Sequence, residues 1–144
     1  MIKGGQTMAA NISENNSTNN DVQNFIETNA LLPTGPAKEL FIAGVSVFEI
    51  TIFTPPVQRV TILAINLPEP DTFGPYDSYT ATLSTPGSDV PLSTLYLVPT
   101  EDKQNWVANT LLDFGGTIPD IEVSVRPTSY DRMGEVILRG PVFP

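Results

Sequence analysis

Acidic side chains are the residues of this chain best suited to chemistry, and three of them fall in one loop. Glu69, Asp71 and Asp77 lie in the proline-rich stretch PEPDTFGPYD. Carboxylate oxygens close together in sequence are ligands that Ca²⁺ takes, but this spacing matches no EF-hand loop. Acidic residues in proline-rich loops are usually solvated turn formers, so we expect no metal here.

Further carboxylates could supply the acid and base of a glycosidase, which needs two carboxyl groups at a set separation. The residues to consider are Glu49, Asp113, Asp120 and Glu122. Any acidic chain offers such pairs, so composition alone does not favour them. Asp113-Phe114-Gly115 spells the metal-binding tripeptide of kinases, yet the accompanying Gly-rich loop, Lys strand and catalytic loop are absent. We therefore expect no catalytic residue.

Cysteine and histidine are both missing from the 144 residues. Their absence excludes disulfides, thiolate nucleophiles, His-dependent triads and zinc sites built on thiolate or imidazole. Most enzyme classes are excluded with them. We expect a protein that is not an enzyme and that needs no cofactor.

The charge balance limits the choice of partner. Seven Lys and Arg against 16 Asp and Glu give a net charge of −9, which repels nucleic acid and anionic membranes. Charged residues make up only 16% of the chain, against about 25% in an average soluble protein. Ser and Thr occupy 25 positions, and such a polar, weakly charged surface protects poorly against self-association.

Five aromatic residues could form a platform that stacks on a sugar, as in a carbohydrate-binding module. They are Tyr76, Tyr79, Tyr96, Trp106 and Tyr130. Aromatic side chains more often fill a core, and we expect Trp106 to pack between sheets because it offers the largest area to bury.

The stretch from Leu40 to Leu67 is the predicted centre of a β-sheet core, because it holds two long apolar runs with one break at Thr54-Pro55-Pro56. In residues 48–53, Phe48, Ile50 and Ile52 share one face, and residues 60–67 are rich in β-branched side chains. Period two and β-branching both indicate strands.

Proline then recurs at almost every boundary between short strand-like runs. We expect strands over residues 78–83, 92–98, 121–125 and 135–139, with residues 92–98 buried on both faces and a hairpin turn at residues 86–89. The pattern of residues 105–114 suits either a strand through Trp106, Ala108 and Thr110 or a short helical turn, and we favour the strand. Seven or eight short strands without a convincing helix indicate an all-β fold, a single antiparallel β-sandwich or jelly roll. We place that domain at residues 37–144.

Residues 1–36 are expected to form a flexible arm and linker. The Asn-rich tract of residues 11–20 cannot bury enough apolar surface to order itself. Val22, Phe25, Ile26 and Asn29 fall at helical spacing and could form a short turn. Together with Leu31 and Leu32, the apolar residues among them (Val22, Phe25, Ile26) form the predicted assembly arm, which docks either on its own core or on a neighbour.

Two expectations concern the start of the chain. Codons for Lys3-Gly4-Gly5 resemble a bacterial ribosome-binding site, so residues 1–7 could be untranslated and Met8 the true start. No apolar run suits a signal peptide or a membrane span. We expect synthesis in the cytosol and a final place on a spore surface or in an assembled particle.

A sandwich domain with an N-terminal arm resembles the self-assembling jelly-roll subunits of Gram-positive endospore surface appendages. The resemblance implies a structural subunit that binds copies of itself through its arm and strand edges. Those subunits commonly carry cross-linking cysteines, which this chain lacks, so its contacts would be non-covalent. Two alternatives are a bacteriophage or viral jelly-roll capsid or decoration protein, and a monomeric β-sandwich module that binds carbohydrate or a surface protein.

Overall fold

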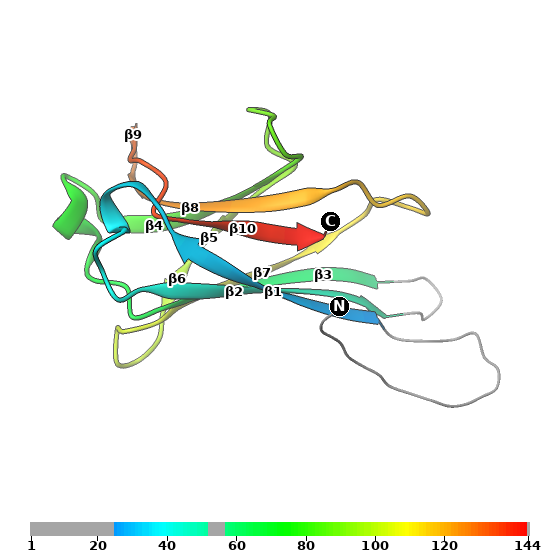
Figure 1. Ribbon diagram of the computed structural model, residues 1–144, viewed down its shortest axis with the longest axis horizontal. Coiled ribbons are helices and arrows are strands. Elements are labelled where there is room, and N and C mark those ends of the chain that lie inside the picture. Colours follow the sequence, from blue (N-terminus) through cyan, green and yellow to red (C-terminus); the bar gives the residue numbers. More distant parts are fainter. Residues whose placement is uncertain (1–24, 52–56, 144) are drawn as a thin grey trace.

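The computed structural model describes residues 25–51 and 57–143, and within these ranges the fold is almost entirely antiparallel β-structure (Figure 1). This confirms the predicted fold class. The strands are β1 (Phe25–Pro33), β2 (Ala43–Thr51), β3 (Val57–Ile65), β4 (Ser78–Ser84), β5 (Ser93–Tyr96), β6 (Val98–Pro99), β7 (Trp106–Leu112), β8 (Ile121–Ser129), β9 (Arg132–Met133) and β10 (Leu138–Phe143). Two short 3₁₀ helices, η1 (Gly35–Ala37) and η2 (Pro70–Phe73), lie in the connections.

The strands form two layers that share β1. The first layer, here the β2 sheet, has the order β1-β2-β3-β7-β6, and the second, the β8 sheet, has the order β5-β4-β8-β10 with β9 beside β8. Residues 25–31 of β1 pair with β2, whereas Leu32 and Pro33 pair with β10. One continuous sheet is thus folded over on itself, and Figure 1 shows its halves as a lower and an upper layer.

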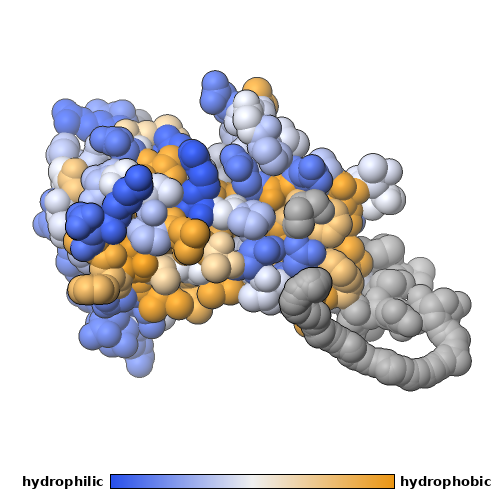
Figure 2. Space-filling model, viewed as in Figure 1, coloured by the Kyte–Doolittle hydropathy of each residue, from blue (hydrophilic) through white to orange (hydrophobic). Residues whose placement is uncertain are grey.

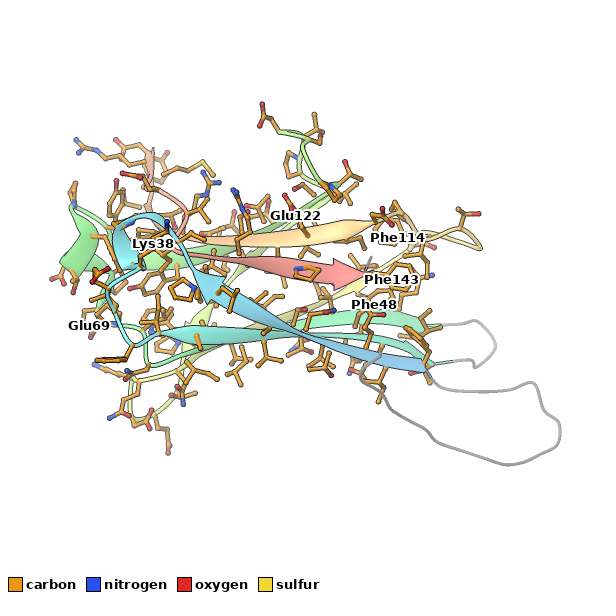
Figure 3. The ribbon with its side chains drawn as sticks, in the orientation of Figure 1. Lys38, Phe48, Glu69, Phe114, Glu122 and Phe143 are labelled. Carbon is orange, nitrogen blue, oxygen red and sulfur yellow. The ribbon has the colours of Figure 1, made fainter. Side chains whose placement is uncertain are left out.

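Strict alternation fills the space between the layers. Phe48, Val60 and Ile62 from the β2 sheet are fully buried, as are Tyr79 and Val123 from the β8 sheet. The predicted common face of Phe48 and Ile50 is therefore confirmed, as are strands within residues 60–67 and over residues 78–83. At one end of the core the ring of Phe143 lies 5.2 Å from that of Phe48 and 6.2 Å from that of Phe25 (Figure 3).

The point where β1 changes sheets requires close backbone approach. Leu31 is fully buried there, between two glycines. A methyl group on Gly44 would lie 3.1 Å from Leu31 Cβ, and one on Gly140 would lie 2.7 Å from Leu31 Cδ2 and even closer to the carbonyl oxygen of Ala30. The two glycines let β2 and β10 approach β1 from either side.

The start of the folded part corrects the predicted domain boundary. β1 is an integral strand, so residues 25–36 are not a flexible arm, and neither the helical turn through Phe25 and Asn29 nor the linker from Leu31 is formed. The alternating apolar pattern of β1 is broken in the sequence because two polar residues, Glu27 and Asn29, lie on its inward side. There Asn29 Nδ2 donates to Glu27 Oε2 at 3.0 Å. Val22, the Asn-rich tract, residues 1–7 and residues 52–56 lie outside the described residues.

Two further predictions are wrong in detail. Residues 92–98 are not buried on both faces, because Leu95 and Leu97 are buried while Tyr96 and Val98 are 73% and 60% exposed. The last strand begins only at Leu138, three residues later than the predicted run from Glu135. In the described part of the chain no helix is long and apolar enough to cross a membrane.

Candidate interaction site

The segment from Ser93 to Pro99 carries the chain from one layer to the other. β5 pairs with β4 in the β8 sheet, and β6 pairs with β7 in the β2 sheet. Leu97 lies between them, buried, with its N–H donating to the carbonyl oxygen of Tyr79 at 3.0 Å. This crossing joins the two sheets on the side of the sandwich opposite β1, and it closes one end of the gap between them there.

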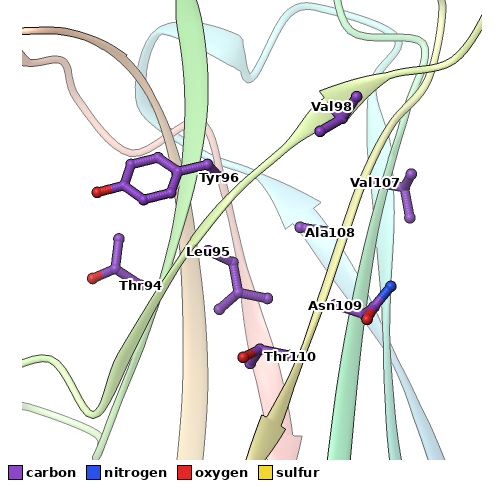
Figure 4. Close-up of a pocket in the computed structure, with 8 residues that line it drawn as sticks. All are labelled: Thr94, Leu95, Tyr96, Val98, Val107, Ala108, Asn109 and Thr110. Carbon is purple, nitrogen blue, oxygen red and sulfur yellow. The ribbon is translucent and has the colours of Figure 1, made fainter.

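Beyond the crossing, β5 and β7 separate and leave an open seam. In the described residues β6 pairs with β7 only at Trp106 and Val107, and β5 has β4 as its ladder partner. A groove of about 490 Å³ lies between them (Figure 4). It is lined by Thr94, Leu95, Tyr96, Val98, Val107, Ala108, Asn109 and Thr110.

The side chains of the seam have two orientations. Figure 4 shows Leu95 of β5 directed toward Ala108 and Thr110 of β7, so these three form the inner part of the groove, whereas Tyr96 and Asn109 point away on either side. None of the eight lining residues is charged. An extended chain entering here would meet apolar and hydroxyl groups and no charge.

The backbone of β7 offers hydrogen bonds toward the seam. Thr100 N–H donates to the carbonyl oxygen of Asn105 at 2.8 Å, which fixes the β6 side of the strand. Backbone groups alternate along an antiparallel strand, so Val107, Asn109 and Leu111 direct N–H and C=O to this same side. Natural edge strands are usually blocked by Lys, Pro or a bulge. The sequence Ala-Asn-Thr-Leu-Leu of residues 108–112 contains neither Lys nor Pro.

The five aromatic residues singled out from the sequence do not form one platform. Tyr79 and Trp106 are buried together in the core, with ring centroids 4.9 Å apart and edge to face. Tyr96 lines the seam, and Tyr130 is fully exposed beside β9. Tyr76 is half-buried against Gly134. Trp106 thus packs between the sheets as expected, and stacking on a sugar by the exposed tyrosines stays a prediction.

Tyr79 has a structural partner instead of a ligand. Its hydroxyl donates to the carbonyl oxygen of Pro68 at 2.7 Å. Burial raises the pKa of this phenol above its ordinary value, and the nearby carboxylates of Glu69 and Asp71 raise it further. The buried phenol therefore stays neutral and holds the loop before η2 against the core.

The acidic residues considered for chemistry are dispersed. In the described ranges no group of three or more acidic side chains could hold a metal ion, and this includes the loop with Glu69, Asp71 and Asp77. Glu49 lies on the outer face of the β2 sheet and Glu122 on that of the β8 sheet (Figure 3), so the two cannot flank one substrate bond. Asp113 and Asp120 lie in exposed loops beyond β7 and before β8.

The residues of the predicted assembly arm are divided by the fold. Leu31 is a core residue, whereas Ile26 and Leu32 of the same strand are 62% and 64% exposed and Phe25 is 41% exposed. Their role in assembly stays a prediction. Most of the residues that line the seam were not identified from the sequence, because the groove is formed by strands whose ladder partners lie far away in the chain.

These features define the class: an antiparallel β-sandwich whose accessible site is an open strand edge. The chain belongs to the family described as SPbeta prophage-derived uncharacterized protein YoqH, whose model matches residues 24–143. It is 30% identical over 96 residues to the protein of that description from Bacillus subtilis (strain 168), over 64% of this chain and 63% of the relative. The aligned part thus spans less than two thirds of that relative. No solved structure matches the chain.

Proposed function

We propose that the protein is a non-enzymatic structural subunit of a phage particle, which assembles with further copies of itself by strand addition at the β5–β7 seam. The observation that carries this proposal is the uncharged, unblocked edge of β7 facing that of β5. The name of the relative refers to a prophage, which favours a phage particle over a spore-surface fibre.

Strand addition suits this seam because both edges face it. β5 and β7 run antiparallel to each other, since β6 continues the direction of β5 and pairs antiparallel with β7. An entering strand would therefore be antiparallel to one edge and parallel to the other. Main-chain hydrogen bonds supply the affinity in this mode of recognition, and alternate side chains entering pockets supply the specificity.

The occupant that fits is the N-terminal segment of a neighbouring copy. In the sequence Met8, Ala10 and Ile12 alternate with Ala9 and Asn11, which suits a strand with one apolar side. Residues 13–24, rich in Asn, would span up to about 40 Å as a tether. β1 and the seam lie on opposite sides of β2 and β3, so the segment of one copy would have to cover its own sheet to reach its own seam.

Two full-length variants test the seam. Asn109→Pro removes an N–H that faces the seam and leaves the ladder to β3, whereas Asn109→Ala removes only the side chain. We expect wild type and Asn109→Ala to form species well above the 15.6 kDa monomer in light-scattering chromatography, and Asn109→Pro to be smaller. A chain lacking residues 1–24 keeps every described strand and should also form smaller species than wild type.

Other results would contradict the proposal. A wild-type monomer at every concentration would favour the monomeric binding module, which a glycan array would then test. Equal assembly by Asn109→Pro and Asn109→Ala would mean that the seam is not used. A monomeric full-length chain that loses stability without residues 1–24 would mean that the segment docks on its own domain.

A further inference from the structure

The outer faces of the two sheets differ in chemistry. The outer side of the β8 sheet carries mainly hydroxyl and charged side chains, of which Thr80, Ser84 and Ser124 are buried, together with the exposed Tyr96 and Pro141. Others are Thr82, Thr94, Glu122, Arg126 and Arg139. The outer side of the β2 sheet is mostly apolar and includes Ala30, Val45, Leu63, Ile65, Val98 and Val107. Figure 2 shows apolar side chains gathered in the lower part of the view, where β1 and β2 run. An exposed apolar patch is typical of an interaction surface, so this difference points to the outer face of the β2 sheet as one.

Register places the side chains of this outer face in three rows across the four strands β1, β2, β3 and β7. The first row is Ala30, Val45, Leu63 and Val107, the second is Thr28, Val47, Thr61 and Asn109, and the third is Ile26, Glu49, Arg59 and Leu111. In the first and third rows the outer pair and the inner pair each match, apolar with apolar or carboxylate with guanidinium. In the second row the outer pair joins a hydroxyl to an amide, and the inner pair joins Val47 to Thr61.

This symmetry makes the face complementary to itself. A two-fold axis parallel to the strands and midway between β2 and β3 places β1 of one copy over β7 of the other, and β2 over β3. Glu49 then faces Arg59 of the second copy, Ile26 faces its Leu111, and Val45 faces its Leu63. Sheets that pack face to face keep their strands nearly aligned in this way.

We infer that a second copy of the chain packs on the outer face of the β2 sheet through this two-fold axis. Among the described strand residues on the face, Glu49 and Arg59 are the charged ones, so the contact is neutral although each chain carries −9. Two such chains meet here without the repulsion that their net charge imposes elsewhere.

The described strands supply part of the area that an interface needs. Four strands about 4.8 Å apart with side chains over roughly nine residues of 3.3 Å give a projected area near 500 Å², and a stable interface buries about 800 Å² per partner. Val98, which is 60% exposed and pairs with Val107, extends the first row onto β6. We therefore expect a dimer at the weak end of the range. The dimer face shares Val98, Val107 and Asn109 with the rim of the seam, and the rest of it lies on β1, β2 and β3.

Charge reversal tests the inference in a chain that lacks residues 1–24, so that the proposed strand donor is removed while every residue of the outer face, including Asn109, is kept. Arg59→Glu makes both charges acidic and Glu49→Arg makes both basic. Each variant alone should be monomeric, or dimerise at least tenfold more weakly, in sedimentation velocity. An equal mixture of the two should restore the dimer, because each acidic pair then meets a basic pair.

Controls keep the outcomes distinct. Glu122→Arg reverses a charge on the outer side of the other sheet, away from the seam, and should leave the dimer intact. Thermal melts show that each variant is folded. Dimers of either single variant at wild-type strength would overturn the inference, as would a mixture that stays monomeric. Strand addition at the seam is tested separately. Equal sizes of full-length Asn109→Pro and Asn109→Ala, with Glu49 and Arg59 unchanged, would show that the seam is not used.

Discussion

Tyr79 contributes to the core as a hydrogen-bond donor as well as an apolar side chain. Its ring packs on Trp106 and on Phe73, whose centroid lies 6.4 Å away, and its hydroxyl reaches the carbonyl oxygen of Pro68. Alternation in the sequence places Tyr79 on the same face as Ala81 and Leu83, and all three are buried. The hydrogen-bond partner of the Tyr79 hydroxyl could not be predicted from the sequence, because Pro68 precedes a loop whose path depends on η2.

Tyr79→Phe isolates the hydroxyl. The ring contacts remain, but the Pro68 carbonyl loses its donor, so we expect the free energy of unfolding to fall by about 1–2 kcal/mol. Urea denaturation followed by far-UV circular dichroism measures the change. Tyr130→Phe, at a fully exposed position, is the matched control and should be neutral; equal effects of the two would refute the assigned hydrogen bond.

The raised pKa of Tyr79 also predicts a loss of stability at alkaline pH. The unfolded phenol ionises near pH 10, whereas the folded phenol holds its proton to higher pH. Above about pH 10 the unfolded state therefore binds fewer protons than the folded state, and stability falls as the pH rises. Tyr79→Phe should flatten this part of the curve, which denaturation series between pH 8 and 11 would reveal. An unchanged slope would show that other groups cause the decline.

The turn between β6 and β7 is built from local hydrogen bonds. Thr100 Oγ1 donates to Asp102 Oδ1 at 2.6 Å, and Lys103 N–H donates to the carbonyl oxygen of Thr100 at 2.8 Å. The hydrogen bond from Thr100, assisted by the N–H of Gln104, lowers the pKa of Asp102. The turn fixes the antiparallel return of β7 and hence the edge that the seam presents.

Lys103 closes this turn at a positive φ of 59°, a conformation that costs an L-residue roughly 1–2 kcal/mol. Lys103→Gly removes that strain but adds entropy to the unfolded chain, so we expect a net gain of about 0.5 kcal/mol in unfolding free energy. Lys38→Gly is the control: Lys38 has φ −57°, and the same change should destabilise. Thermal denaturation with opposite signs for the two variants supports this account, and a loss at both sites contradicts it.

Alternation in sequence was enough to place β2, β3, β4 and β8, since most of their inward positions are apolar, with Ser46 and Gln58 as polar members. It failed for β1, where Glu27 and Asn29 on the inward side satisfy each other by a hydrogen bond and so break the apolar pattern. It failed again for residues 92–98, because a segment that crosses between sheets exposes Tyr96 and Val98 although both are apolar. The seam itself follows from strand order, which no local pattern encodes.

At the scale of the whole molecule, the passage of β1 from one sheet to the other joins the two layers. Gly140→Ala places a methyl group against the carbonyl oxygen of Ala30 at this passage, and the backbone of β1 can move aside only at the expense of its ladders. We expect a loss of about 1–3 kcal/mol, typical of overpacking. Gly116→Ala, where a methyl group meets nothing within 4 Å, is the control for urea denaturation. A neutral Gly140→Ala would mean that the strands separate easily there.

The contact between Phe25 and Phe143 has a consequence for the connectivity of the chain. The two ends of the folded part are adjacent, so a short linker from Phe143 to Phe25 would convert it into a ring without displacing a strand. Opening that ring at Gly87, where φ is +80° and no other group lies within 4 Å of an added methyl, yields a circular permutant. It should retain the same β-type circular dichroism spectrum. Its new termini lie between β4 and β5, at one end of the strand order. In such a permutant, residues 1–24 can be attached to the new N-terminus instead of to β1. Assembly of this protein would show that the sequence of the segment matters, and loss of assembly would show that its point of attachment matters.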